Sequence, residues 1–142
     1  MATLDAPAEI RAVLDCTALQ SYARGHVHVG ELFREVGDEE DSLIAIPSVA
    51  LMDAHARSLD NAAARALLKY VVTLPNAVVL DLDTATVPIV ARHVPVMNGD
   101  LSRAHAVWAA MAYGALCFTT EPEAYPPQVL PEQVVAIPAE DA

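Results

Sequence analysis

The chain has 142 residues, the usual length of one domain, and 54% of them are hydrophobic, which supplies a core and excludes a disordered protein. The 19 acidic and 8 basic residues give a net charge of −11, which argues against a broad basic face for nucleic acid and suits a carboxylate metal site or a basic protein partner. Apolar stretches are too short to span a membrane and residues 1–10 lack the pattern of a secretory signal, so we expect a cytoplasmic protein.

Hydrophobic runs and periodicity predict strands that alternate with helices in the first half of the chain. In chain order these are a buried strand at 10–16, a helix over TALQSYA, an amphipathic helix from 31 that ends near Gly37, an extended segment at 42–47 and two helices between 48 and 72. The boundary between the last two helices is expected near Asp60 and Asn61. The acidic run GDEED at 37–41 is expected to be a solvated turn.

The second half continues the alternation. It predicts a fully buried strand at 76–82, a helix at 83–93, a helix from Ser102 to Tyr113, a strand at 115–120 and an edge strand at 134–138. Asp83 or Thr84 is expected to cap the helix at 83–93. Gly114 is expected to end the helix that runs from Ser102 to Tyr113. This order favours a single domain over 1–142, with a three-layer α/β/α fold around a central parallel sheet of four or five strands.

Acidic residues follow the predicted strands or begin helices near them. Asp15 ends the first strand, Glu121 follows the strand at 115–120, Asp100 begins a helix and Asp53 lies within one. In open parallel sheets, ligands bind beyond the carboxyl ends of the strands, so we expect the four acids to converge there. Such a group of like charges is expected to raise the pKa of at least one carboxylate.

Three segments resemble the motifs of PIN-domain ribonucleases, the fold of VapC-type toxins. VLDCTAL at 13–19 resembles the opening strand of that family, where an Asp is followed by a small residue, then Ser or Thr, then Ala-Leu. IPSVALMDA at 46–54 resembles the second acidic block. DLSRAHAVWAAMAYGALCFTTEPEAY at 100–125 resembles the last block, in which an acid opens a helix and a later strand leads to a further acid. The resemblance covers about residues 10 to 138.

The resemblance implies a site of four acids that bind Mg²⁺ or Mn²⁺ and hydrolyse an RNA phosphodiester without a covalent nucleophile. Carried over by position, the first and third acids are Asp15 and Asp100; the second, usually Glu, is Asp53, and the fourth, usually Asp or Asn, is Glu121. Both departures keep the charge but alter side-chain reach, to which Mg²⁺ geometry is sensitive. Further residues at family positions or on the same helix are candidates for substrate contact: Thr17, Thr119 and His105.

Several alternatives stay open at this stage. Asp15 and Asp100 are also good helix caps, and His105 among Ala and Val is also typical of a packed core histidine. A second hypothesis is a PIN-like regulatory or interaction module with weakened catalysis. Asp53 and Glu121, which depart from the family pattern, are the residues that distinguish this hypothesis from the nuclease. A small-molecule or redox domain is disfavoured, because no glycine-rich loop follows the first strand and no Cys-x-x-Cys is present. His26 and His28 lack a third ligand for zinc.

Expected partners are RNA, an antitoxin protein that brings a basic segment to the acids, and a second copy of the chain through the apolar segment LLKYVV at 67–72. No membrane partner is expected. Cys16 and Cys117 both lie in apolar runs that predict buried strands, so we expect buried free thiols and no disulfide.

Overall fold

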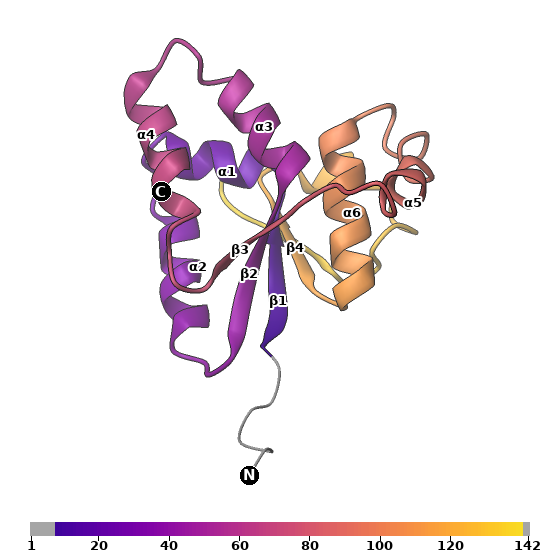
Figure 1. Cartoon of the computed structure of the whole chain (residues 1–142), viewed down its shortest axis with the longest axis horizontal. Helices are drawn as coiled ribbons and strands as arrows, with labels where there is room; N and C mark the ends of the chain where they lie inside the picture. The colour runs from indigo at the N-terminus through magenta and orange to yellow at the C-terminus, as the bar shows by residue number, and fades with distance from the viewer. Residues whose placement is uncertain (1–7, 141–142) are drawn as a thin grey trace.

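Five parallel strands form the centre of the protein and helices cover both faces, as the computed structural model shows for residues 8–140 (Figure 1). The strands are β1 (Glu9–Leu14), β2 (Ser42–Pro47), β3 (Ala77–Leu80), β4 (Leu116–Thr119) and β5 (Val134–Ala136). The helices are α1 (Cys16–Ala23), α2 (His28–Gly37), α3 (Ser48–Ala56), α4 (Ala62–Val71), α5 (Val87–Ala91) and α6 (Leu101–Tyr113), with a 3-10 turn at Pro122–Ala124. The predicted three-layer α/β/α fold is confirmed.

The strand order is β3-β2-β1-β4-β5, so the chain winds outward in one direction from β1 through β2 to β3 and in the other through β4 to β5. The direction reverses between β1 and β4, where Val13 lies opposite Cys117. The first strand is therefore central, and Val13 and Leu14 are fully buried. Ligand sites of open parallel sheets form at such a reversal.

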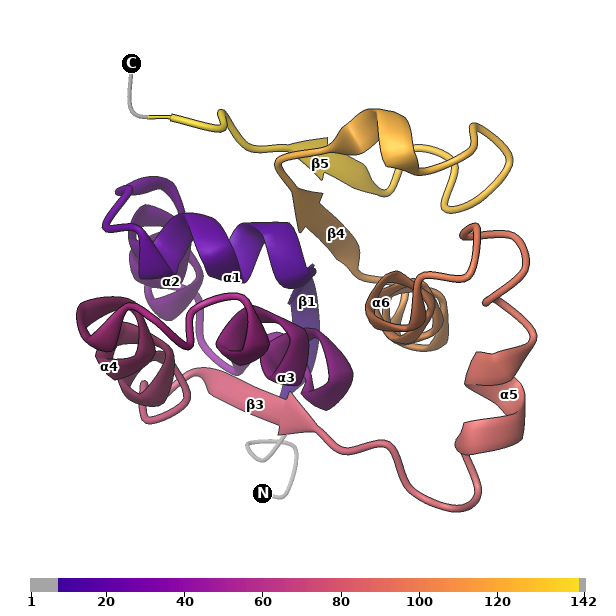
Figure 2. The ribbon, with the colours of Figure 1, turned by 90° about the horizontal axis from the view of Figure 1, so that it is seen from above.

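Side chains that alternate along the strands build two cores. Helices α1, α2 and α4 cover one face of the sheet and α5 and α6 lie on the other, whereas α3 lies beyond the carboxyl ends of the strands and contacts both α1 and α6 (Figure 2). Leu14, Ile46 and Leu68 belong to the first core, and Val13 and Val107 to the second. Neighbouring residues on β1 thus point to opposite faces, as pleated strands require.

Local signals placed most boundaries correctly. Asn61 caps α4 by accepting a hydrogen bond from the Ala64 amide at 3.0 Å, near the predicted boundary. Gly114 ends α6 in the left-handed region at φ 62°, which suits glycine because it has no Cβ. The structure puts Cys16 at the start of α1 rather than in a strand, because Asp15 caps that helix. Cys117 lies in β4 as expected, and burial raises the pKa of both thiols to about 12.

Two predicted elements differ from the structure. The strand at 76–82 is shorter, spanning Ala77–Leu80, and all four of its residues are only half-buried, because β3 is an edge strand. The helix at 83–93 is reduced to Val87–Ala91 with Thr86 in the cap position. Asp83 does not cap it; its carboxylate accepts a hydrogen bond from the Thr86 amide at 2.9 Å and forms a separate turn.

Within residues 8–140, no helix combines the length and apolar character that crossing a membrane requires. Residues 1–7, which contribute to the expectation about a secretory signal, lie outside the described range. In the segment proposed for a homodimer, Leu68 and Val71 are fully buried, and Tyr70 is the large hydrophobic side chain that it exposes, at 57%.

Candidate functional site

All four predicted acids line one small pocket of about 100 Å³ at the carboxyl ends of the strands. Asp15 follows β1 and caps α1, and Asp100 caps α6. Asp53 lies on α3, and Glu121 follows β4. The structure therefore brings together residues that are more than 100 positions apart in the chain, because β1 and β4 are neighbours in the sheet.

Asp15 is fully buried, and both of its oxygens accept hydrogen bonds. Its Oδ1 accepts from the Ala18 amide at 3.0 Å, which is the helix cap, and from the Thr17 hydroxyl at 2.6 Å. Its Oδ2 accepts from the Tyr125 hydroxyl at 2.7 Å. Burial raises the pKa of Tyr125 far above its ordinary value, so the phenol keeps the proton that it donates. The capping interpretation and the site interpretation of Asp15 are thus both compatible with its contacts.

A chain of hydroxyl groups joins the ends of β1 and β4. The Oγ1 atoms of Thr17 and Thr119 lie 3.0 Å apart, and because Thr17 donates its hydrogen to Asp15, Thr119 is the donor between them. Thr17 also accepts from the Thr120 amide at 2.9 Å, and Thr119 accepts from the Glu121 amide at 3.0 Å. Both predicted threonines therefore fix the positions of site acids, and Thr119 is fully buried.

Ser102 and Arg57 hold Asp53. The Ser102 Oγ lies 3.0 Å from Asp53 Oδ2 and 2.9 Å from Asp100 Oδ1, and its single hydrogen serves one of these acceptors at a time. The Arg57 Nε donates to Asp53 Oδ1 at 3.0 Å. Burial alone would raise the pKa of Asp53, but the hydrogen bonds from Arg57 and Ser102 outweigh it and lower that pKa. At Asp53 the crowding of carboxylates therefore does not raise the pKa, because cationic and hydroxyl donors stand beside this side chain.

Arg103 joins the other two acids from its position on α6. Its Nη1 donates to Asp100 Oδ2 at 2.9 Å and its Nη2 to Glu121 Oε1, while only 17% of the side chain is exposed. Burial would lower the pKa of Arg103, but Asp100 and the neighbouring acids outweigh it and raise that pKa. The pocket thus holds four carboxylates against the two guanidinium groups of Arg57 and Arg103, which leaves two negative charges uncompensated.

The donor chemistry of the pocket fits Mg²⁺ or Mn²⁺, which prefer carboxylate oxygens. Its present arrangement is that of an ion-pair network: in the described part of the chain, no group of three or more His, Cys, Asp or Glu side chains is arranged to hold a metal ion. Ser102 bridges Asp53 and Asp100, and Arg103 bridges Asp100 and Glu121. A bound divalent ion would have to take over the acceptors that these two side chains now occupy.

No family model matches the chain, and no curated protein matches it significantly. The pocket itself and the sequence motifs are therefore the basis for assigning a function to the chain.

His105 lies away from this pocket. It is fully buried on α6, and its ring stacks on Trp108 with centroids 5.8 Å apart. Its Nδ1 accepts from the Val49 amide at 3.4 Å, so it joins α6 to the first turn of α3. Burial lowers the pKa of His105 and favours the neutral ring. A side chain with no exposed surface does not reach a substrate, so its position gives it a structural role in place of the predicted substrate contact.

Proposed function

We propose that the chain is a Mg²⁺- or Mn²⁺-dependent endoribonuclease of the PIN type that acts on RNA in the cytoplasm. The observation that carries the proposal is the convergence of Asp15, Asp53, Asp100 and Glu121 on one pocket at the reversal between β1 and β4. Two uncompensated negative charges in that pocket complement one divalent cation.

The pocket residues would have two roles: the acids hold the metal ion, and their neighbours keep the acids in position. Asp15, Asp53, Asp100 and Glu121 would hold the ion, which when bound lowers the pKa of a water molecule and neutralises charge on the phosphate. Thr17 keeps Asp15 in place through its hydroxyl.

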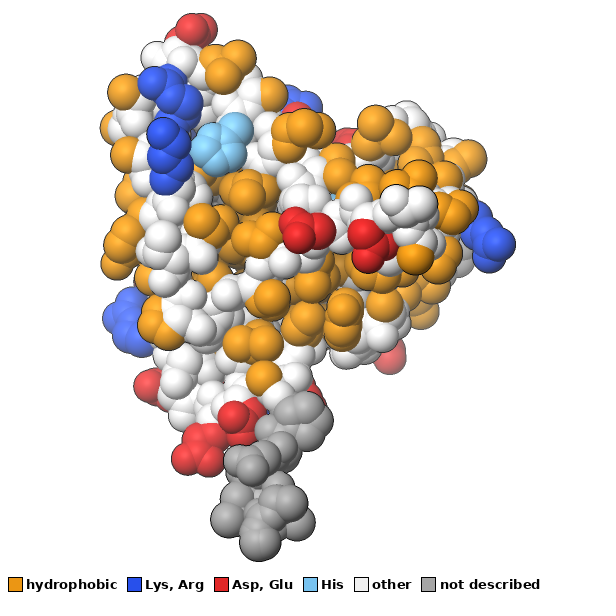
Figure 3. Space-filling view, viewed as in Figure 1, with side chains coloured by type: hydrophobic (Ala, Val, Ile, Leu, Met, Phe, Trp, Pro, Cys, Tyr) orange, Lys and Arg blue, Asp and Glu red, His pale blue; other side chains and the backbone are white. Residues whose placement is uncertain are grey.

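Arg57 is the cation best placed to meet a phosphate, because 58% of its side chain is exposed at the mouth of the pocket while its Nε stays on Asp53. The rest of the surface offers RNA little support. On the face in Figure 3, hydrophobic side chains gather over α5 and α6, and Lys and Arg stand at the margins. With a net charge of −11, the protein would hold RNA mainly through the metal and the few arginines near it.

Cleavage of single-stranded RNA tests the catalytic proposal. We expect activity only with Mg²⁺ or Mn²⁺, and none in Asp100→Asn, because Asn removes the charge and still caps α6. Asp83→Asn is the matched control, since it makes the same change in an exposed, turn-forming Asp outside the pocket. Cleavage by Asp100→Asn at the wild-type rate, or by the wild-type protein in excess EDTA, would reject the mechanism.

Thermal unfolding tests the metal site without a substrate. A ligand that binds only the folded protein stabilises it by RT ln(1 + [L]/Kd), roughly 2.7 kcal/mol at a hundredfold excess over Kd. We expect Mn²⁺ to raise the Tm of the wild-type protein but not that of Asp15→Asn. An equal rise in both would place the ion elsewhere, for example at the acidic turn 37–41.

A second candidate is a PIN-like regulatory or interaction module with weakened catalysis. The observation that favours it is Arg103, whose guanidinium already forms ion pairs with both Asp100 and Glu121. On this reading the wild-type protein shows no Tm shift with Mn²⁺, whereas Arg103→Gln gains one because two acids are released. The nuclease proposal instead expects the shift in the wild-type protein. An antitoxin with a basic segment would compete for the same carboxylates in either case.

A further inference from the structure

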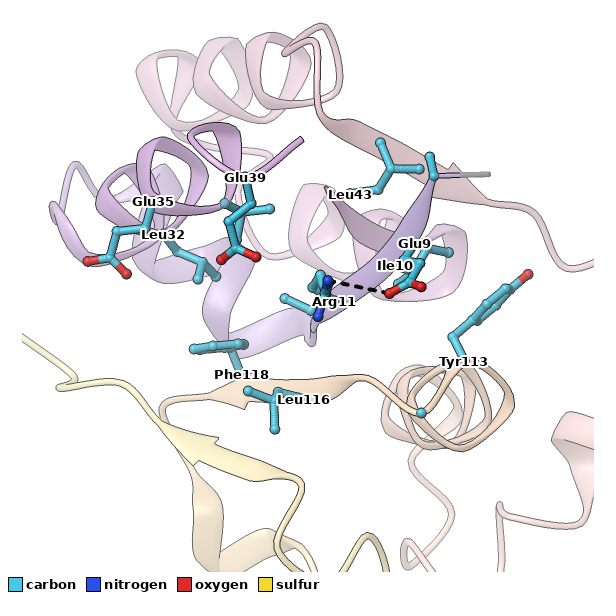
Figure 4. A pocket seen from close by; sticks show the side chains of 14 residues that line it. Glu9, Ile10, Arg11, Leu32, Glu35, Glu39, Leu43, Tyr113, Leu116 and Phe118 are labelled. Carbon is cyan, nitrogen blue, oxygen red and sulfur yellow. Dashed lines mark ion pairs between the residues drawn. The ribbon is translucent and has the colours of Figure 1, made fainter. Parts of the chain in front are cut away.

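A groove separate from the acid pocket runs between α2 and the strands β1, β4 and β5. One part, of about 840 Å³, lies at the amino-terminal ends of β1 and β4 (Figure 4). A second part, of about 190 Å³, reaches the end of β5. The two parts share Leu32, Glu35 and Phe118, so they form one continuous groove. It has no lining residue in common with the acid pocket.

The floor of the groove is apolar because the helical layer is incomplete there. Helix α2 packs mainly on β2, and the helices with most contact to β4 are α1 and α6, so within residues 8–140 the starting half of β4 has little helical cover on this face. Leu116 is 41% exposed, and Phe118 and Leu32 are only partly buried. Parallel sheets are normally covered on both faces, so this is the place where one further helix would complete the layer.

The rim of the groove is acidic. Glu31 and Glu35 on α2, and Glu39 in the turn after it, line the groove at intervals of four residues. All three are exposed, and none of their carboxylates forms an ion pair within residues 8–140. Arg11, which lies on β1 and also lines the groove, is paired with Glu9 at 3.5 Å (Figure 4). Like charges four residues apart destabilise a helix, so this unpaired row lowers the stability of α2 by itself.

We propose that this groove binds a cationic amphipathic helix of a partner protein. Apolar side chains of that helix lie on Leu32, Leu116 and Phe118, and its Lys or Arg side chains face the glutamate row. Nucleic acid and anionic membranes are excluded as occupants because the three unpaired glutamates repel them. The proposal is independent of the nuclease proposal, since the groove and the acid pocket share no lining residue.

A synthetic helical peptide tests the groove directly. The probe is a fluorescent peptide of leucine and lysine, long enough at about 15 residues to form a helix, with leucine on one face and lysine on the other. We expect saturable binding to the full chain by fluorescence anisotropy. Glu31→Lys/Glu35→Lys should weaken it about tenfold or more, and Leu116→Ser should weaken it too. The charge-matched control Asp60→Lys/Asp83→Lys carries the same net charge and should bind like the wild-type protein.

Equal weakening by the two double variants would mean that the peptide senses only the overall charge, and would overturn the proposal. So would an absence of binding, or unchanged binding by both Glu31→Lys/Glu35→Lys and Leu116→Ser. Binding that appears only after residues 1–7 are removed would make this chain's own N-terminal segment the occupant and would also overturn it. If Glu31→Lys/Glu35→Lys fails to fold, as judged by circular dichroism, Leu116→Ser on the exposed floor decides the test.

Discussion

Tyr125→Phe is expected to destabilise the protein through the loss of one hydrogen bond. The Tyr125 hydroxyl donates to Asp15 Oδ2 at 2.7 Å, and the two side chains are 6% and 0% exposed. Water therefore does not replace the lost donor. A hydrogen bond to a charged group contributes about 1.5–3 kcal/mol, and the Cys117 thiol, which donates to the same hydroxyl at 3.6 Å, also loses its acceptor. At about 4 °C for each kcal/mol in a chain of this size, the Tm should fall by about 6–12 °C.

Urea and thermal unfolding measure this loss against Tyr113→Phe, the same chemical change at a tyrosine that is 47% exposed at the end of α6. That control should change the free energy of unfolding by less than about 0.5 kcal/mol. In a double-mutant cycle, Tyr125→Phe should cost less in an Asp15→Asn background, because a hydrogen bond to a neutral amide is weaker. A loss in Tyr125→Phe no larger than in Tyr113→Phe would refute the role given to this hydroxyl.

Three further predictions concern Asp53, Gly114 and Gly30. Because the pKa of Asp53 is lowered in the folded protein, its contribution to stability should be full above the ordinary pKa of an aspartate and be lost as the pH falls from there through the lower value. Asp53→Asn should therefore flatten the acid limb of a stability-against-pH curve, and Asp60→Asn should not. Gly114→Ala should lower the free energy of unfolding by about 1 kcal/mol because Gly114 has φ 62°, as urea titration will show. Gly30→Ala, in α2 with open space around the new Cβ, should instead raise it by about 0.5–1 kcal/mol.

Much of the fold follows from local signals in the sequence. The apolar run before Asp15 predicts a buried strand, and the alternation of strands and helices predicts the parallel sheet. The convergence of the acids follows as well, because Asp15 and Glu121 stand at the carboxyl ends of strands that such a sheet places side by side. Chain position and strand polarity together determine these features, and no knowledge of side-chain packing is needed.

The partners of the acids could not be predicted in the same way. Tyr125 stands in a Pro-rich loop, and nothing local marks its hydroxyl as a donor to a residue 110 positions earlier. Ser102, two residues after Asp100, gives a weak signal for the bond to Asp100 but none for the bond to Asp53 on another helix. The Arg103 pairing with Glu121 likewise depends on how α6 packs beside β4. Tertiary packing sets these contacts, and they decide whether the pocket is open to an ion.

The long sequence separation between Asp15 and its donor has a consequence for synthesis. The central strand β1 leaves the ribosome well before its neighbour β4 and the Tyr125 hydroxyl, which come from the last third of the 142 residues. A nascent chain that stops short of this region can fold some helices but leaves one edge of β1 unpaired and Asp15 without its phenol donor. Contacts of such long range also make folding slow compared with local helix formation. A product truncated before Leu116 therefore lacks both β4 and Glu121, one of the four acids of the pocket.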